Sequence, residues 1–223
     1  MRPQAPAGKF RCEGKLEREL RARGFRAVAG TDEAGRGSLF GPVFAAAVIL
    51  SPDRPIRGLN DSKLLDPERR EVLAERIQER AAAWAVASVD ASTVDRINIY
   101  QASRLAMRLA VEKLRPEADF VLVDAASLDV ALPQQAVIHG DARCHAIAAA
   151  SILAKVHRDR SMRDFDRVFP GYGLARHKGY STPEHLEALS RLGPTPLHRA
   201  TFLPVRNLLP SAQLNLFEQA GAG

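Results

Sequence analysis

The chain has 223 residues, of which 46% are hydrophobic and 26% charged, a composition typical of soluble globular proteins. No apolar run approaches the roughly 20 residues of a membrane helix, and no apolar segment follows the basic N-terminus as in a secretory signal, so we expect a cytoplasmic protein without a membrane partner. The two cysteines, Cys12 and Cys144, form no C-x-x-C pair, which argues against a disulfide framework or a zinc knuckle.

The positive charge is concentrated at the N-terminus. The formal net charge is +6, and residues 1–26 alone contain eight Lys or Arg and three Glu, a net of +5. This basic segment could follow the phosphates of a polyanion. A solvated amphipathic helix around Leu16 and Leu20 is an equal alternative.

The first half of the chain predicts two strands, a helix and a third strand. Residues 25–31 and 42–50 are the first two strands, and the second is a continuous apolar run typical of a strand buried on both faces. Asp66-Pro67-Glu68 combines an N-cap, a proline at the first helical position and an early acid, so a helix follows to about Ala83. Residues 84–90 return to strand.

The second half alternates helices with short strands. A helix over 95–115 ends before Pro116, and the apolar strand 120–124 ends in an acid. A brief strand at 136–139 leads into an alanine-rich helix from about 143 to 168, and a shorter helix lies near 183–192. This order predicts an α/β fold with a mixed sheet.

Acidic residues follow two of the predicted strands. Asp32, with Glu33 beside it, and Asp124 stand at carboxyl ends of apolar strands, where open α/β sheets place their ligands. If these strands are neighbours, the carboxylates converge and need cations to offset their repulsion. Mg²⁺ suits them because it prefers oxygen ligands and keeps waters that can serve in chemistry.

Each acid also has a purely structural interpretation. The Asp-Glu pair fits a solvated strand end, Asp124 fits the start of a turn, and Asp141 fits the N-cap of the alanine-rich helix. Asp159 has Lys155 and Arg163 four residues to either side, which favours an ion pair on the helix face over a role in a site.

Six sequence blocks identify a family that the chain resembles. "GTDEAGRGSLFGPVFAAAVIL", "LNDSKLL", "VLVDA", "GDARCHAIAAASILAKVHRD", "YGLARHKGYSTPEH" and "HRATF" are similar, in this order, to the signature blocks of ribonuclease HII, the type 2 ribonuclease H of bacteria. The resemblance implies an RNase H-like α/β fold with a central mixed sheet flanked by helices and a small helical C-terminal part. We therefore expect a basic extension over 1–24, a catalytic domain over 25–206 and a flexible tail over 207–223.

The resemblance implies a metal-dependent endonuclease acting on RNA joined to or paired with DNA. Its metal-binding and catalytic acids would be Asp32, Glu33, Asp124 and Asp141, with Mg²⁺ or Mn²⁺ in a two-metal site. Two metals on one scissile phosphate predict in-line hydrolysis that leaves a 5′-phosphate and a 3′-hydroxyl, without a covalent intermediate. Ala125 and Ala146 replace the glycine and serine usual in the family, which affects fine geometry without removing a ligand.

The resemblance also implies substrate contacts. The backbone of Gly35-Arg36-Gly37 would read a 2′-hydroxyl, since glycines let the backbone approach a ligand closely, and the same segment also fits a tight turn. Tyr180 would pack on the sugar beside the ribonucleotide, where an ordinary surface tyrosine is the alternative. Lys63 and Lys155 are candidates for phosphate contacts, with exposed lysines as the alternative. Ser151, Lys155 and Arg158 share one helix face, which favours a polar, ligand-facing stripe.

The tail contains a second candidate motif. "QLNLF" resembles the pentapeptide by which bacterial replication and repair proteins dock on the sliding clamp, and its contact residues would be Gln213, Leu214, Leu216 and Phe217. A flexible peptide with a Leu-Phe anchor is a common recognition mode. The alternative is that the three apolar residues pack back on the domain.

These features together predict a monomeric enzyme that cleaves at ribonucleotides in duplex DNA and in RNA–DNA hybrids, with roles in ribonucleotide excision repair and primer removal. A type 3 ribonuclease H is a rival of the same fold, although "DEAGRG" fits type 2 better. A non-catalytic hybrid-binding protein and a generic two-metal phosphatase are rivals from other classes.

Overall fold

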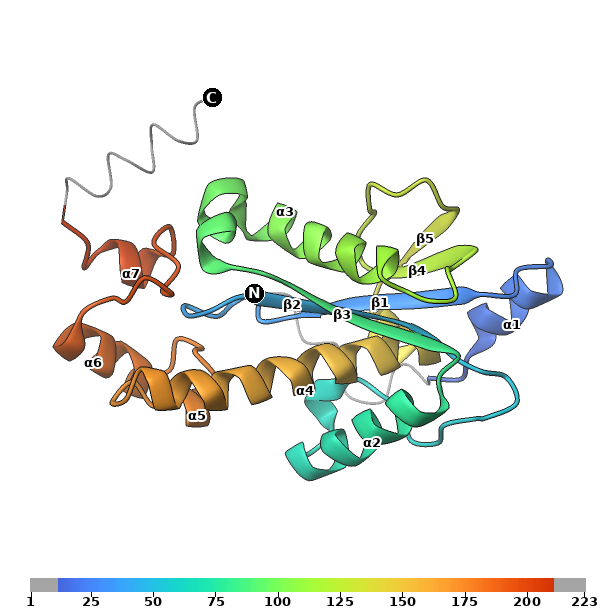
Figure 1. Ribbon diagram of the computed structural model, residues 1–223, viewed down its shortest axis with the longest axis horizontal. Helices are drawn as coiled ribbons and strands as arrows, with labels where there is room; N and C mark the ends of the chain where they lie inside the picture. Colours follow the sequence, from blue (N-terminus) through green and yellow to red (C-terminus); the bar gives the residue numbers. More distant parts are fainter. Residues whose placement is uncertain (1–11, 211–223) are drawn as a thin grey trace.

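A five-stranded mixed sheet forms the centre of the protein in the computed structural model, which describes residues 12–210 (Figure 1). The strand order is β3-β2-β1-β4-β5. β1 is antiparallel to β2 and β2 to β3, whereas β4 is parallel to both β1 and β5. The strands are β1 Val28–Ala34, β2 Val43–Ile49, β3 Ala83–Val89, β4 Phe120–Asp124 and β5 Gln134–Val137. The predicted mixed sheet is confirmed.

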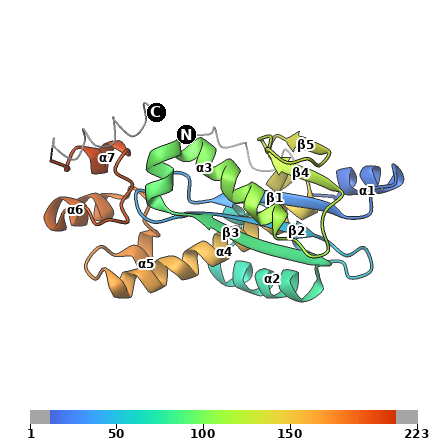
Figure 2. The same cartoon turned by 45° about the horizontal axis from the view of Figure 1, so that its top comes forward.

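Helices cover both faces of this sheet, as the turned view of Figure 2 shows. α3 packs on one face, and α4 with α2 beside it packs on the other. The short helices α5, α6 and α7 gather around the end of α4 and form the small helical C-terminal part that was predicted (Figure 1). The helices are α1 Lys15–Ala22, α2 Pro67–Arg80, α3 Ala91–Glu112, α4 His145–Val168, α5 Leu174–His177, α6 Pro183–Leu192 and α7 Leu203–Arg206.

Local capping fixes where the helices begin. The Asp66 carboxylate accepts a hydrogen bond from the Arg69 amide at 2.7 Å, and Pro67 is the first helical residue of α2, as predicted. α3 begins four residues earlier than expected because Asp90 caps it through the Thr93 amide at 2.8 Å. The helix then kinks at Asn98, whose φ of 62° is left-handed.

Small residues allow α4 to lie close to the sheet. Ala148, Ala149 and Ala150 are fully buried against it, so this run serves packing. A Cβ on Gly30 in β1 would lie 2.3 Å from backbone atoms of Ala146 and Ile147. Only glycine at this position permits the observed approach of strand and helix.

The described part of the N-terminal basic segment forms the amphipathic helix α1. Leu20 is buried against Val28 and Phe120, so the helix packs on the sheet through its apolar face. Glu17 is also buried and accepts a hydrogen bond from the amide of Ala146 at 2.9 Å. This bond attaches α1 to the first turn of α4.

Both cysteines are free thiols, as expected. Burial, together with the negative charge of Glu17, raises the pKa of Cys12 and of Cys144 to about 12, so both stay protonated at neutral pH. Among residues 12–210, every helix is too short or too polar to cross a membrane.

Candidate active site

Neighbouring strands place Asp32 and Asp124 side by side. Side chains alternate along a strand, and the even-numbered residues of β1 and β4 face α4. The pairing of β1 with β4 ends at Thr31 and Val123, and the two aspartates are the next residue on each strand. The sequence predicted that Asp32 follows the end of its strand. This prediction was wrong, because the pairing of β1 with β2 continues to Ala34.

The Asp32 carboxylate lies in a strongly negative environment. Burial raises its pKa well above the usual range, and the negative charges of Glu33, Asp124 and Asp141 raise it further, while a hydrogen bond with Ser151 opposes them. Asp124 is buried as well, and its Oδ1 accepts a hydrogen bond from the Gly140 amide at 2.9 Å. These acids therefore repel one another in a site with little access to water.

Asp141 belongs to this acidic site and does not cap α4. It lies in a short 3₁₀ turn, Gly140–Ala142, while the N-cap of α4 is Cys144, which makes no side-chain capping bond. The capping interpretation is therefore wrong. Burial raises the pKa of Asp141, and the charges of Asp61 and Asp124 add to this effect.

Lys63 provides a positive charge within the acidic cluster. Its Nζ lies 3.5 Å from Asp141 Oδ2 and 3.8 Å from Asp61 Oδ1. Although burial opposes the charged form, the pKa of Lys63 is raised by Asp61, Asp141, Asp32 and Asp124. Asp61 is an acid of the site that the sequence analysis missed, although it stands two residues before Lys63 in the same sequence block.

Glu33 is paired with a guanidinium group, since its Oε1 lies 3.2 Å from Nη1 of Arg36. Its negative charge also contributes to the raised pKa of Asp32. The pairing with Arg36 helps to accommodate the two adjacent acids.

The donor set suits hard divalent cations. Asp32, Glu33, Asp124 and Asp141 offer carboxylate oxygens, which Mg²⁺ and Mn²⁺ accept. Within residues 12–210, no three His, Cys, Asp or Glu side chains are grouped so that they could hold one metal ion. The raised pKa of Asp32, caused by burial and three neighbouring acids, shows that the cluster favours added positive charge.

The Gly35-Arg36-Gly37 loop is fixed by buried arginines. Gly35 has a φ of 96°, and a Cβ there would lie 2.1 Å from Nε of Arg158. The Arg36 carbonyl accepts a hydrogen bond from Arg199 Nη1 at 3.0 Å. By contrast, a Cβ on Gly37 would meet no atom within 4 Å, so the first glycine of the loop is required sterically and the second is not.

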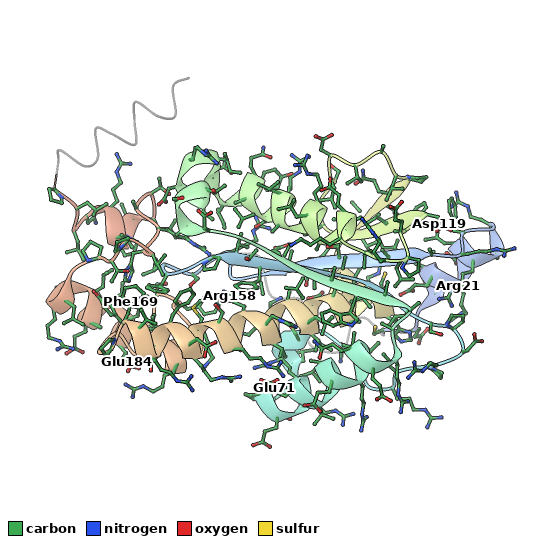
Figure 3. The ribbon with its side chains drawn as sticks, viewed as in Figure 1. Arg21, Glu71, Asp119, Arg158, Phe169 and Glu184 are labelled. Carbon is green, nitrogen blue, oxygen red and sulfur yellow. The ribbon has the colours of Figure 1, made fainter. Side chains whose placement is uncertain are left out.

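Arg158 is a structural residue and not part of a ligand-facing stripe. It is fully buried, and Figure 3 shows it between α4 and the sheet. Its Nη2 donates to Ser38 Oγ at 2.7 Å and to the Lys178 carbonyl at 2.8 Å. On the same helix, buried Ser151 does reach the site, where it contacts Asp32 and bonds Ser62 Oγ at 2.9 Å. The predicted stripe is therefore wrong for Arg158.

Tyr180 lies next to two basic side chains of α4. Its ring centroid is 5.1 Å from Cζ of Arg158 and 5.5 Å from Nζ of Lys155. A β-bridge to Ser38 connects Tyr180 with the glycine loop. The structure thus brings this tyrosine, the loop and Lys155 together from three separate parts of the chain.

Asp159 forms an ion pair on the helix face, as predicted. Its Oδ1 lies 2.7 Å from Lys155 Nζ. The prediction was wrong for Arg163, which binds Glu71 of α2 at 3.0 Å; Figure 3 labels this glutamate. The second cation near Asp159 is Arg70, whose Nη2 lies 3.9 Å from Asp159 Oδ2.

A chain of hydrogen-bonded histidines holds the Tyr180 segment, and sequence reasoning missed it. The amide of Thr195 donates to Nδ1 of His198 at 2.9 Å, so Nε2 of His198 carries the proton and donates to Nε2 of His185 at 3.3 Å. Nδ1 of His185 in turn donates to the Tyr180 carbonyl at 3.0 Å. Arg199, next to His198, also donates to the Gly41 carbonyl at 3.0 Å. No spacing rule could have found these residues.

The predicted clamp-binding peptide, with Gln213, Leu214, Leu216 and Phe217, lies outside the described residues.

The mixed five-stranded sheet, with buried acids on adjacent strands β1 and β4 and helices on both faces, defines an α/β protein of the RNase H-like class. Comparison with known proteins agrees. The ribonuclease HII profile matches residues 29–205, and the chain is 70% identical over 227 residues to ribonuclease HII of Solibacter usitatus (strain Ellin6076), with all of both chains covered. The chain belongs to the ribonuclease HII family, and it is a ribonuclease H, an endonuclease class that uses divalent metal ions.

Solved structures show the same relationship. The ribonuclease H2 from Pyrococcus horikoshii OT3 superimposes with a TM-score of 0.68 at 25% identity, covering 87% of this chain and 100% of that chain. The ribonuclease HII in the PCNA:RNase HII complex from Archaeoglobus fulgidus gives a TM-score of 0.68 at 28% identity. The match covers 82% of this chain and 97% of that chain.

Proposed function

We propose that the protein hydrolyses the phosphodiester bond at ribonucleotides embedded in duplex DNA, and also cleaves RNA–DNA hybrids, to leave 5′-phosphate and 3′-hydroxyl ends. The observation that carries this proposal is the buried pair Asp32 and Asp124 on adjacent strands, with the Asp32 pKa raised by burial and by three other acids. Burial of such a cluster costs free energy, which bound divalent cations would offset.

The proposed metal ligands are Asp32, Glu33, Asp124 and Asp141, which would hold two Mg²⁺ or Mn²⁺ ions. When bound, these ions would lower the pKa of an attacking water and stabilise the leaving oxygen of the scissile phosphate. The protein itself orients the ligands: Ser151 bonds Asp32, and the Gly140 amide bonds Asp124. Lys63, 3.5 Å from Asp141, is available to contact a substrate phosphate.

Gly37 supports recognition of the ribose by the backbone. A Cβ there would meet nothing within 4 Å, so the packing of the chain does not explain the glycine. We propose that it keeps the backbone of the loop accessible to a 2′-hydroxyl, while Arg199 fixes the loop by binding the Arg36 carbonyl. Tyr180, held by the histidine chain, packs on the adjacent sugar.

End-labelled duplexes test this proposal. One duplex carries a single ribonucleotide, a second is all DNA, and a third is an RNA–DNA hybrid, each incubated with Mg²⁺, Mn²⁺ or EDTA. The expected result is a metal-dependent cut immediately 5′ of the ribonucleotide, with a 5′-phosphate on the downstream product. Cleavage of the hybrid alone would show that the protein does not act at ribonucleotides embedded in duplex DNA. Binding without cleavage would favour a non-catalytic hybrid-binding protein. Hydrolysis of small phosphoesters regardless of a 2′-hydroxyl would indicate a phosphatase.

In the cell, we propose that this cut begins the excision of misincorporated ribonucleotides and helps to remove RNA primers, in the cytoplasm.

A Gly37→Ala variant separates reading of the 2′-hydroxyl from metal binding. It should bind the metal as the wild type does and lose cleavage at the embedded ribonucleotide, because the added methyl group hinders the approach of the sugar. Unchanged cleavage would contradict the role of the loop.

We also propose docking on the bacterial sliding clamp through Gln213, Leu214, Leu216 and Phe217. The "QLNLF" sequence supports this proposal, as does the PCNA:RNase HII complex of a related protein. Deletion of residues 211–223 should spare cleavage of naked duplexes and abolish retention of the protein on immobilised clamp. Retention equal to that of the full chain would refute the proposal.

A further inference from the structure

A basic pocket lies beside Tyr180, among the start of α2, the middle of α4 and the α5 region. The cavity measures about 330 Å³. Five cationic side chains and two carboxylates line it, which leaves an excess of three positive charges. The cations are Arg70, Lys155, Arg163, Arg176 and Lys178.

The two carboxylates of the pocket already have partners. Glu71 accepts hydrogen bonds from Arg160 and from Arg163, the latter at 3.0 Å. Asp159 lies 2.7 Å from Lys155 Nζ. Among the residues that line the pocket, neither carboxylate forms an ion pair with Lys178, whose Nζ donates to the Ala175 carbonyl.

Lys178 occupies a backbone position that favours glycine. It ends α5 with a φ of 53°, in the left-handed region where helices commonly end with glycine. Its carbonyl is held by Arg158 at 2.8 Å, so the base of the side chain is fixed beside the pocket. A lysine in a disfavoured conformation points to a use for its side chain.

Cations as well as carboxylates act on the ammonium group of Lys178. Burial lowers its pKa, Asp159 raises it, Arg163 and Lys155 lower it, and Asp166 raises it. A bound phosphate would relieve this repulsion, because it offers several acceptor oxygens to clustered cations.

The pocket lies at a spacing that suits a nucleic-acid backbone. Ser151, which bonds Asp32, marks the position of the acidic site along α4. Lys155 and Asp159 of the pocket lie four and eight residues further along this helix. The pocket therefore begins about 6 Å and ends about 12 Å from Ser151 along the helix axis. A strand that follows α4 advances about 3.4 Å per nucleotide, so this distance corresponds to roughly two to four nucleotides.

We propose that this pocket binds a backbone phosphate of the substrate, two to four nucleotides from the scissile position, with Lys178 as its principal contact. The inference rests on the proposed function, because it takes the substrate to be a duplex that runs along α4. It adds a second anchoring point beyond Tyr180, which fixes the register of the strand over the acidic site.

Neutral phosphate analogues test the pocket. Duplexes with one ribonucleotide carry a single methylphosphonate at each of six positions on either side of it, and KM and kcat are measured for the wild type and three variants. Lys178→Gly removes the side chain at a φ that glycine adopts readily, Lys178→Arg keeps the charge, and Arg167→Ala removes an equal charge from an 82% exposed side chain outside the pocket.

The wild type should show one position, two to four nucleotides from the ribonucleotide, where the methylphosphonate raises KM by about tenfold with little change in kcat. Lys178→Gly should raise KM for the unmodified duplex to the same extent and lose sensitivity at that position, while Lys178→Arg and Arg167→Ala should behave as the wild type. The proposal would be overturned if Lys178→Gly had the same KM for the unmodified duplex as Arg167→Ala. It would also be overturned if a methylphosphonate raised the KM of Lys178→Gly at every position as much as it does for the wild type.

The same comparison separates this inference from the proposed function. If the wild type does not cleave the unmodified duplex, the proposed function fails, and the pocket is then tested by fluorescence anisotropy of duplex binding in EDTA. There Lys178→Gly should weaken binding by about tenfold and reduce the salt slope by about one. Equal binding by Lys178→Gly and Arg167→Ala would refute the phosphate site on its own.

Discussion

Replacement of Gly35 by alanine should strongly destabilise the protein, because the added Cβ would displace Arg158. The Cβ would lie 2.1 Å from Nε and 2.6 Å from Cδ of this side chain, whereas ordinary contact begins near 3.4 Å. The guanidinium group therefore has to move by more than 1 Å. Its hydrogen bonds to Ser38 Oγ at 2.7 Å and to the Lys178 carbonyl at 2.8 Å do not survive such a shift.

The magnitude follows from these two bonds. Each hydrogen bond from a charged group contributes about 1.5–3 kcal/mol, and the left-handed φ of 96° adds roughly 1 kcal/mol for alanine. The free energy of unfolding should therefore fall by about 4 kcal/mol or more, a large part of the 5–15 kcal/mol typical of a domain. Gly37→Ala is the matched control and should change it by less than about 1 kcal/mol, since its Cβ meets no atom.

Urea unfolding followed by the fluorescence of Trp84, the only tryptophan, measures this change. A double-mutant cycle identifies its cause: in an Arg158→Met background, Gly35→Ala should cost only about 1–2 kcal/mol. An equal cost in both backgrounds, or a cost below about 1 kcal/mol in the wild type, would refute the steric argument.

Three further predictions concern stability. Gly30→Ala should destabilise the protein by about 3 kcal/mol or more in urea unfolding, because its Cβ would lie 2.3 Å from the backbone of α4, and a loss below about 1 kcal/mol would contradict this. Ala125→Gly should raise the melting temperature, with a gain of about 0.5–1 kcal/mol, because Ala125 has a φ of 47°; no gain would mean that the site tolerates the strain. Burial and His185 lower the pKa of His198 from 6.5 to about 3, so below pH 6.5 the unfolded state binds a proton that the folded state does not. Stability should therefore fall between pH 6 and pH 4 more steeply in the wild type than in His198→Asn, by about 1.4 kcal/mol per pH unit, and parallel curves would refute it.

Local signals in the sequence predicted most of the fold. Asp66 and Pro67 defined the start of α2, and the apolar run over 42–50 defined β2. The predicted end of β1 was wrong because its pairing with β2 continues through Ala34, and strand length depends on a partner that lies elsewhere in the chain. The start of α3 was missed although Asp90 is a standard capping residue.

Sequence blocks pointed to Asp32, Asp124 and Asp141, which the structure places near one another, although Asp61 was missed. The residues that support the site gave no such signal. Arg158 lies on the same helix face as Lys155, so spacing gave both the same role, yet burial by the Gly35 loop makes Arg158 structural. His185 and His198 meet only through the tertiary fold, and neither has a neighbour in sequence that would indicate their contact.

Asp124 is proposed as a ligand of the catalytic metal, and its substitution tests the proposed function. Cleavage of a duplex with a single ribonucleotide is followed with Mg²⁺ or EDTA for the wild type, Asp124→Asn and Asp129→Asn. Asp129 is the matched control, since its side chain is 93% exposed. Wild type and Asp129→Asn should cut 5′ of the ribonucleotide only with metal, and Asp124→Asn should lose about 100-fold or more. Cleavage by Asp124→Asn at the wild-type rate, or cleavage that persists in EDTA, would contradict a metal-dependent mechanism at Asp124.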